Sequence, residues 1–444
     1  MGTYFGTDGI RGVAGELLTP GFAMSVGRCA AVVLASRRGE RPLFLLARDT
    51  RLSGTMLEAA LVAGLTSGGA RVEVAGVLPT PGLAMLVVQR EADAGIVVSA
   101  SHNPFADNGI KVFSHEGVKL SDEEEDEIEE RLAEDQPSAT GTGFGTAWPL
   151  EGAVGAYVEG VIRRIPLDLS GMRILVDCAN GAMHEAAPLA FAESGADVTC
   201  VACRPDGLNI NAGCGSTHMD FISRQMQAGD YDLGLAFDGD GDRVLAVDHA
   251  GDLVDGDFMI AILARHLKQR GALRRDTVVT TVMTNLGFRQ AMEREGIDVH
   301  VTDVGDRYVM AEMLRGDYVL GGEQSGHIIN RDVSTTGDGL ATAFLLLQAL
   351  RESGMELRQA AAIMRRLPQR LVNVAVRDRQ ALEGCGPVWE AVAAEEERLE
   401  GAGRVLVRPS GTEPLVRIMV EAPTADQCDD VCERLAAIVA RALG

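Results

Sequence analysis

Ser101 and His102 follow a short apolar run in the sequence, residues 95–98, whose composition is typical of a buried strand. The small and polar residues that come next do not extend a strand, and Pro104 biases the residue before it away from helix. A hydroxyl and an imidazole are therefore presented at the tip of a rigid element. A positioned nucleophile requires such an arrangement, although a polar turn after a core strand would show the same pattern.

Three aspartates, Asp238, Asp240 and Asp242, alternate with glycine after the apolar run 233–237. Three carboxylates on one tight loop repel one another strongly unless a cation neutralises them. An EF-hand loop is excluded, because it requires Gly at its sixth and Glu at its twelfth position, where this chain has Arg243 and His249. Three carboxylates leave coordination positions open, which suits Mg²⁺ shared with a phosphate oxygen. Arg243 would direct a positive charge at the same phosphate.

Two further polar loops have the composition of ligand-binding segments. The sequence GGEQSGH at residues 321–327 offers donors and acceptors for vicinal sugar hydroxyls, although a generic turn explains this stretch equally well; its candidate residues are Glu323, Ser325 and His327. The sequence RPSGTEP at residues 408–414 is predicted to form a phosphate cradle of a guanidinium, hydroxyls and free amides. Its candidate residues are Arg408, Ser410, Gly411 and Thr412.

Lysine is scarce in this chain, which has 38 Arg and only three Lys, at positions 111, 119 and 268. Lys111 nevertheless lies close to the proposed nucleophile in sequence. Arginine does not give up its proton in proteins, whereas a partly buried lysine does. We therefore interpret Lys111 as a functional residue. Arg11, in the glycine-rich turn 6–12, is a weaker candidate for holding an anion.

A weak internal repeat predicts the fold. Residues 69–74, 195–200 and 296–301 share a glycine followed by alternating apolar positions, and each follows a helical segment and an earlier apolar strand, at 43–47, 174–176 and 278–282. Strand, helix, glycine cap and strand make a βαβ unit, and three copies indicate three related α/β domains with mixed sheets.

The C-terminal segment has a different pattern, with strands predicted at 371–376 and 415–420 and helices at 387–399 and 425–443. The sequence thus predicts an α/β protein of three mixed-sheet domains and a C-terminal α+β domain around a central cleft. The expected boundaries are 1–148, 149–252, 253–368 and 369–444. Residues 136–148 are interpreted as a linker, and the acidic helix 121–134 as a solvated face.

Composition argues against several functional classes. The formal charge is −23 and no cluster of Lys and Arg is found, so no nucleic-acid partner is expected. No apolar run of about 18 residues and no secretory signal are visible, so no membrane partner is expected and the cytoplasm is the expected location. Eight Cys are too few for a disulfide scaffold, and the CxxC at 200–203 is interpreted as structural.

Taken together with the sequence YFGTDGIRG at residues 4–12, these motifs resemble the α-D-phosphohexomutase superfamily and, within it, the bacterial phosphoglucosamine mutases. The resemblance covers nearly the whole chain, with four motifs in the family's order. It implies that Ser101 carries a phosphate, that Asp238, Asp240 and Asp242 bind Mg²⁺ together with the phosphoserine, and that Arg11, His102 and Lys111 assist proton transfer and charge stabilisation.

The resemblance further implies interconversion of glucosamine 6-phosphate and glucosamine 1-phosphate through a hexosamine bisphosphate, for UDP-N-acetylglucosamine and cell-wall synthesis. A phosphomannomutase or phosphoglucomutase acting on neutral hexose phosphates is the alternative enzyme, and a phosphatase is another. A non-catalytic regulator that binds sugar phosphates would be expected to lack Ser101, Lys111 or one of the aspartates, and all are present. The oligomeric state is left open, with a homodimer as one option.

Overall fold

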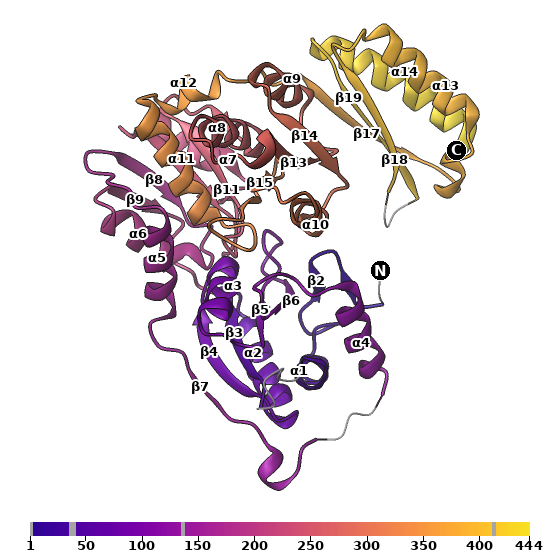
Figure 1. Cartoon of the computed structure of the whole chain (residues 1–444). Coiled ribbons are helices and arrows are strands. Elements are labelled where there is room, and N and C mark those ends of the chain that lie inside the picture. The colour runs from indigo at the N-terminus through magenta and orange to yellow at the C-terminus, as the bar shows by residue number, and fades with distance from the viewer. Residues whose placement is uncertain (1–2, 35–40, 135–137, 411–413) are drawn as a thin grey trace. The chain divides into compact units, whose positions relative to one another are not determined.

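The computed structural model describes residues 3–34, 41–134, 138–410 and 414–444, which form two compact units. The first unit comprises Met1–Met283 and Ile297–Ile363, and the second comprises Thr284–Gly296 and Met364–Gly444. Three mixed sheets belong to the first unit and one antiparallel sheet belongs to the second (Figure 1).

The first sheet has the strand order β1-β2-β6-β5-β3-β4-β7. Its strands are β1 (Phe5–Gly6), β2 (Gly9–Val13), β3 (Leu43–Arg48), β4 (Arg71–Val77), β5 (Ala94–Val98), β6 (Asp107–Ser114) and β7 (Ala147–Pro149). The helices of this part are α1 (Pro20–Val33), α2 (Gly54–Ser67), α3 (Thr80–Gln89) and α4 (Asp122–Leu132), followed by the short 3₁₀ helix η1 (Gly141–Gly143). Apolar side chains of β3 and β5 pack against α1 and α2 in one buried core.

The second sheet has the order β12-β11-β10-β8-β9. Its strands are β8 (Arg173–Asp177), β9 (Asp197–Val201), β10 (Leu233–Phe237), β11 (Val244–Asp248) and β12 (Leu253–Val254), and its helices are α5 (Ala153–Arg164), α6 (Met183–Glu193) and α7 (Met219–Ala228). Strands β10 and β11 form an antiparallel hairpin, and the turn between them carries the aspartate motif. Because all five residues of β10 are buried, the turn starts from a rigid base.

The third sheet has the order β14-β13-β15-β16. Its strands are β13 (Thr277–Thr281), β14 (Asp298–Thr302), β15 (Leu320–Gly322) and β16 (Ile328–Asn330). The helices of this part of the first unit are α8 (Gly256–Gln269), α10 (Asp306–Gly316), α11 (Gly339–Ser353) and α12 (Leu357–Ala361), together with η2 (Arg274–Asp276). The antiparallel pair β15 and β16 presents the loop that carries Glu323 and Ser325.

The second unit contains a three-stranded sheet of order β17-β19-β18. Its elements are α9 (Leu286–Glu295), β17 (Gln369–Ala375), η3 (Gln380–Leu382), α13 (Gly386–Arg398), β18 (Arg404–Pro409), β19 (Leu415–Glu421) and α14 (Ala425–Leu443). Its own apolar core joins the sheet to α13 and α14. The sequence predicted the two helices and the strands β17 and β19 but not the edge strand β18, which places Arg408 inside a strand.

The predicted repeat is confirmed by strand pairing. Strands β3 and β4, β8 and β9, and β13 and β14 each pair in parallel. The three predicted cap glycines, Gly69, Gly195 and Gly296, have φ values of +93°, +87° and +66°. L-residues with a side chain rarely adopt this left-handed conformation, which explains why glycine recurs at the same point of each unit. The α/β fold class is therefore confirmed.

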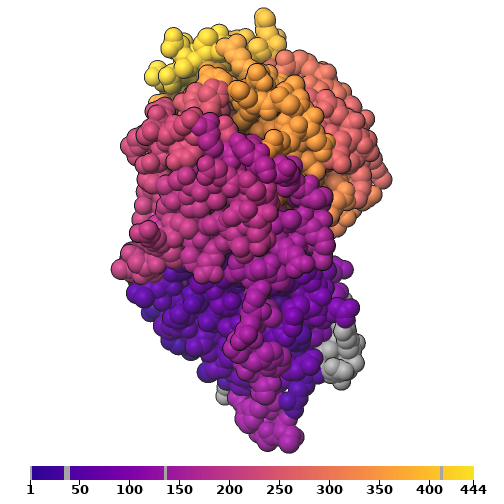
Figure 2. Space-filling model, turned by 90° about the vertical axis from the view of Figure 1, so that its left-hand side faces the viewer, coloured from indigo at the N-terminus to yellow at the C-terminus, as the bar shows by residue number. Residues whose placement is uncertain are grey.

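The predicted linker 136–148 differs from the structure over its described part, which begins at residue 138. Strand β7 pairs in parallel with β4, and Gly145 N donates to Thr66 O over 2.8 Å. A Cβ at Gly145 would lie 1.7 Å from Ala70 O, so close packing requires this glycine. Figure 2 shows the purple segment that precedes α5 lying along the surface of the indigo N-terminal part. Glycine is common both in flexible linkers and in segments whose backbone packs closely against a neighbour, so glycine content alone does not distinguish the two.

Among the described residues, no helix combines the length and the hydrophobicity that crossing a membrane requires.

Candidate functional site

Ser101 lies three residues after the end of β5, in a tight turn. Its φ of 52° lies in the left-handed region, which is uncommon for a residue with a side chain. Ser101 N donates to Ser99 Oγ over 2.9 Å, and Ser99 Oγ in turn donates to Asp49 Oδ2 over 2.6 Å. All three residues are fully buried. The turn therefore fixes the direction in which the Ser101 hydroxyl points.

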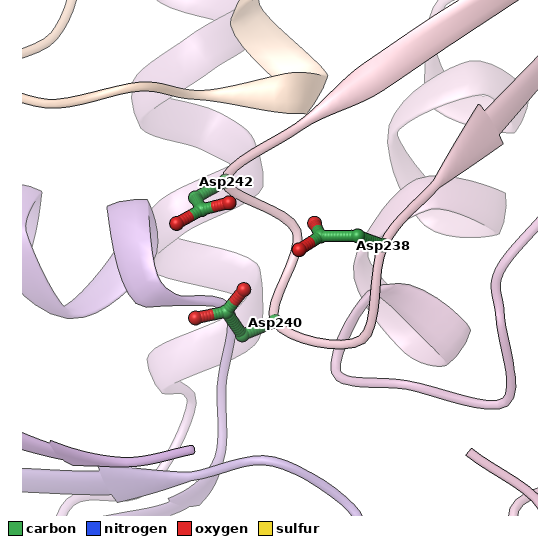
Figure 3. A group of neighbouring side chains, drawn as sticks. All are labelled: Asp238, Asp240 and Asp242. Atoms are coloured by element: carbon green, nitrogen blue, oxygen red, sulfur yellow. The ribbon is translucent and has the colours of Figure 1, made fainter. Parts of the chain in front are cut away.

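The Ser101 hydroxyl points at the aspartate loop between β10 and β11. Ser101 Oγ donates to Asp238 Oδ2 over 2.5 Å, although the two residues are 137 positions apart. The carboxylates of Asp238, Asp240 and Asp242 point to the same side of the loop (Figure 3), and one oxygen of each lies within 4.8 Å of the others. The predicted nucleophile and the predicted metal ligands are thus adjacent in the structure.

The aspartate loop fits a hard divalent cation. Asp240 Oδ1 and Asp242 Oδ1 are buried and accept no hydrogen bond among the described residues. Burial, followed by the negative charges of Asp242 and Asp240, raises the pKa of Asp238 well above its ordinary value. A cation among the three carboxylates would remove this repulsion and use the oxygens that lack a donor. The all-oxygen ligand set is the one that Mg²⁺ prefers.

Lys111, on β6, lies at the same loop and is 1 % exposed. Lys111 Nζ lies 2.8 Å from Asp240 Oδ2, 3.4 Å from Asp242 Oδ2 and 3.3 Å from Asp8 Oδ2. Burial alone would lower the pKa of Lys111, but the charges of Asp240, Asp8 and Asp242 outweigh burial and hold it well above its ordinary value. Lys111 is therefore a fixed cation here, and it would become a proton donor only if nearby negative charge were neutralised.

His102 lies beside the nucleophile, with Nδ1 3.3 Å from Ser101 Oγ. Burial, followed by the positive charges of Arg243 and Arg11, lowers the pKa of His102 to about 4. The imidazole is accordingly neutral near pH 7 and available to accept a proton. Arg11 forms an ion pair with Asp8, and Arg11 Nη1 lies 3.5 Å from Asn103 Oδ1. Arg11 therefore also borders the turn that carries Ser101.

Two charged residues of this network, Asp8 and Lys119, were missed by the sequence analysis. Asp8 contacts Arg11, Lys111 and Lys119, and Lys119 Nζ lies 2.6 Å from Asp306 Oδ2 on α10. The scarcity of lysine that drew attention to Lys111 applies equally to Lys119, so that observation would have identified it. Asp8 could be found only from its contacts.

The candidate sugar-binding residues of the first unit border the same loop. Glu323 Oε1 accepts from Gly305 N over 3.1 Å, and Ser325 Oγ lies 3.4 Å from Glu323 Oε2. Arg243 Nε lies 3.6 Å from Asp242 Oδ1. The structure thus brings Glu323, Ser325 and Arg243 to the part of the molecule that holds Ser101.

His327 has a different environment from that expected of a sugar contact. It is 3 % exposed, and its two ring nitrogens lie 3.7 Å from Asp242 Oδ2 and 3.6 Å from Asp306 Oδ2. Burial would lower the pKa of His327, but the hydrogen bond and charge of Asp242 raise it. The imidazole therefore links the aspartate loop to α10, and its assignment as a substrate ligand stays a prediction.

The predicted phosphate cradle belongs to the second unit. Arg408 lies on β18 opposite Arg417 of β19, and Arg379 Nη1 donates to Ser410 O over 2.8 Å. Three arginines thus lie on or contact the strand segment that leads to this motif, and cationic side chains suit an anion. Gly411 and Thr412 lie outside the described residues.

The acidic helix α4 is only partly solvated. Ser121 and Glu124 form the capping box at its start. On its inner side, Glu125 is buried and accepts from Arg307 Nη2 over 2.9 Å, and Glu129 accepts from the backbone amide of Phe5 over 2.6 Å. Two of its acids thus join α10 and the N-terminal strand β1 to helix α4, which the sequence interpretation did not anticipate.

Comparison with known proteins gives matches along the whole chain. The four models of the phosphoglucomutase/phosphomannomutase family match: α/β/α domain I at residues 2–139, domain II at 155–251, domain III at 255–367 and the C-terminal domain at 371–438. A curated relative, the phosphoglucosamine mutase of Desulforudis audaxviator, is 51 % identical over 442 residues, which are 99 % of this chain and 98 % of the relative.

Solved structures share the fold at lower sequence identity. A phosphoglucomutase/phosphomannomutase family protein from Burkholderia thailandensis is 23 % identical with a TM-score of 0.81, covering 98 % of this chain and 97 % of that one. The N-acetylphosphoglucosamine mutase of Aspergillus fumigatus, solved with GlcNAc-6P and magnesium, is 19 % identical with a TM-score of 0.68, covering 99 % of this chain and 96 % of that one.

Proposed function

The chain belongs to the phosphoglucomutase/phosphomannomutase family, and from that premise we propose that it interconverts glucosamine 6-phosphate and glucosamine 1-phosphate. The observation that carries the chemistry is the 2.5 Å approach of Ser101 Oγ to a loop of three buried aspartates. Full-length identity of 51 % to a phosphoglucosamine mutase supports the amino sugar as the substrate.

The reaction follows from the residues around Ser101. In the active form Ser101 Oγ carries a phosphoryl group. A free hydroxyl of the sugar phosphate attacks its phosphorus, the bond from phosphorus to Ser101 Oγ breaks, and a hexosamine bisphosphate forms. After the intermediate turns over, Ser101 Oγ attacks the other phosphate, whose bond to the sugar oxygen breaks. Transfer of this kind depends on positioning and on electrostatic stabilisation.

Each charged group has a place in this scheme. Asp238, Asp240 and Asp242 would hold Mg²⁺, which supplies positive charge to the oxygens of the transferring phosphoryl group. His102, neutral near pH 7, accepts the proton of the attacking hydroxyl and returns it to the sugar oxygen that leaves in the second transfer. Lys111 stabilises the negative charge that develops on Ser101 Oγ.

The remaining candidate residues bind the substrate. Glu323 and Ser325 contact the hydroxyls of the sugar, and Arg243 contacts the reacting phosphate. Arg408 and Ser410 hold the distal phosphate, together with Gly411 and Thr412. We propose that the reaction takes place in the cytoplasm, because its product is a precursor of UDP-N-acetylglucosamine and of the cell wall.

The experiment that tests the proposal compares kcat/KM for glucosamine 1-phosphate, glucose 1-phosphate and mannose 1-phosphate, with Mg²⁺ and a hexose bisphosphate present. A clear preference for the amino sugar is the expected result. Preference for a neutral hexose would overturn the substrate assignment while leaving the roles of Ser101 and the aspartate loop in place. Release of inorganic phosphate without isomerisation would instead indicate a phosphatase.

A further inference from the structure

Arg51, in the loop between β3 and α2, is among the most deeply buried large side chains of the protein, with 1 % of its surface exposed. Its backbone amide and Nε donate to the carboxylate of Asp49, over 2.9 and 2.8 Å. This ion pair satisfies only part of the guanidinium. The remaining nitrogens point into the turn that carries Ser101.

Four backbone carbonyls of the serine turn accept hydrogen bonds from the Arg51 guanidinium. Nη2 donates to Ser101 O and Asn103 O, each over 2.9 Å, and Nη1 donates to Asp107 O over 3.0 Å and to Pro104 O. A planar guanidinium offers several donors in a fixed geometry, which a lysine ammonium does not reproduce. Arg51 therefore binds the turn along its whole length.

Asn211 reaches the same turn from the second sheet domain. Its Nδ2 donates to Ser101 O over 2.9 Å and to Asn103 O over 3.1 Å, the same two oxygens that Arg51 Nη2 contacts. Asn211 is 6 % exposed, and its backbone amide donates to Ala179 O over 2.9 Å. Side chains from two sheet domains thus converge on two carbonyl oxygens.

The aspartate loop packs directly on these contacts. A Cβ at Gly239, between Asp238 and Asp240, would lie 2.5 Å from Ser101 O and 2.8 Å from Asn211 Nδ2. The aspartate loop approaches the Ser101 carbonyl so closely that residue 239 must be glycine. The carbonyl of Ser101 is thus held by Arg51 and Asn211, while its hydroxyl donates to Asp238.

We propose that Arg51 and Asn211 are positioning residues for phosphoryl transfer: they hold the carbonyl oxygens of Ser101 and Asn103 and so keep Ser101 in the left-handed conformation that directs Oγ at the aspartate loop. Neither side chain needs to touch the substrate. This inference rests on the proposed phosphoserine mechanism. Transfer rates are sensitive to small displacements of the reacting atoms, so loss of either side chain lowers the rate of transfer more than substrate binding.

The test compares Asn211→Ala with Asn209→Ala, a matched control from the same loop. Among the described residues, the Asn209 side chain forms hydrogen bonds only within its own segment, with Arg204 O and Asp206 N. We expect Asn211→Ala to lower kcat at least about tenfold with KM changed less than about threefold. In single-turnover measurements, transfer of phosphate from Ser101 to substrate should slow by the same factor. Asn209→Ala should leave both values near those of the wild type.

Arg51→Lys is a second variant. It keeps a positive charge beside Asp49 but loses the several fixed N–H donors of the guanidinium. If it folds, its kcat should fall at least about tenfold; if it does not fold, Asn211→Ala decides alone. A folded Asn211→Ala enzyme with wild-type kcat, or equal losses in Asn211→Ala and Asn209→Ala, would overturn the inference.

The assay uses whichever hexose phosphate the wild type turns over best, so an error in the proposed sugar does not affect this test. If the wild type carries no phosphate on Ser101, the proposed function fails before the positioning question arises.

Discussion

Ser101 is the single residue on which the proposed transfer depends. Ser101→Ala should abolish mutase turnover, because Ser101 supplies the one hydroxyl among the described residues that donates to Asp238. Intact mass should also show the loss of a covalent phosphate, about 80 Da, that the active wild type carries. Ser25→Ala, on the exposed side of α1, is the control and should change neither measurement. Substantial activity in Ser101→Ala would show that the nucleophile lies elsewhere.

Lys111 offers a second test at the residue scale. Lys111→Arg retains a positive charge but places a larger group among three carboxylates that lie within 3.4 Å of Nζ. We expect kcat to fall by at least about a hundredfold, because the displaced carboxylates no longer fit the cation and because arginine gives up no proton. Lys268→Arg, on a partly exposed ion pair with Asp276, is the matched control.

Titration of Lys111→Arg with Mg²⁺ separates the two causes of the loss. An unchanged Mg²⁺ midpoint together with a low kcat would favour a role for Lys111 in proton transfer. A raised midpoint would favour disturbance of the aspartate loop. A nearly wild-type rate would contradict both explanations and reduce Lys111 to a replaceable cation.

At the scale of single elements, a buried aspartate at the start of α11 has a raised pKa. Asp338 caps the helix by accepting from Ala341 N, and it also accepts from Tyr157 Oη over 2.7 Å. Burial raises the pKa of Asp338 to about 6. The folded state therefore binds a proton more tightly than the unfolded chain does, so this group's contribution to stability is present at low pH and is lost as the pH rises through 6.

Asp338→Asn should remove this pH dependence, because asparagine caps a helix as well and carries no charge. Relative to the wild type, the variant should gain up to about 3 kcal/mol in free energy of unfolding between pH 4 and pH 7. Urea unfolding at several pH values measures this difference. Asp126→Asn, on the exposed side of α4, is the control. A difference that does not vary with pH would show that Asp338 does not titrate as described.

The elements themselves were largely predictable from the sequence. Helix α14 has the predicted bounds, because a long amphipathic pattern leaves little choice of structure, and strand β10 coincides with the apolar run 233–237. Strand β7 and strand β18 were missed, since each depends on a neighbouring strand more than on its own composition. A short strand such as β7, whose pairing partner β4 lies far away in sequence, carries a weak local pattern.

The site was predictable where chemistry is concentrated in one motif, as in the aspartate loop. It was not predictable where function depends on pairing between distant segments. The contacts of Arg51 with the serine turn and of Lys119 with Asp306 each join segments of ordinary composition. Arg51 is one of 38 arginines, so its residue type does not single it out, and the partner of the rarer Lys119 became visible only in the structure.

For the whole molecule, the two compact units lead to a prediction about thermal unfolding. The aspartate loop lies in the first unit, while the second has its own apolar core of strands and helices. A ligand that binds only the folded state stabilises the unit that contains its site, by about 2.7 kcal/mol when its concentration is a hundred times its Kd. We therefore expect two calorimetric transitions, of which Mg²⁺ raises only the larger.

Asp240→Asn is the informative variant for this experiment, because it removes one carboxylate from the proposed cation site. Its larger transition should respond to Mg²⁺ much less than that of the wild type, while the smaller transition should be the same in both proteins. An equal response of both transitions to Mg²⁺ would show that the two units unfold together, and an unaltered response in Asp240→Asn would remove the aspartate loop as the cation site.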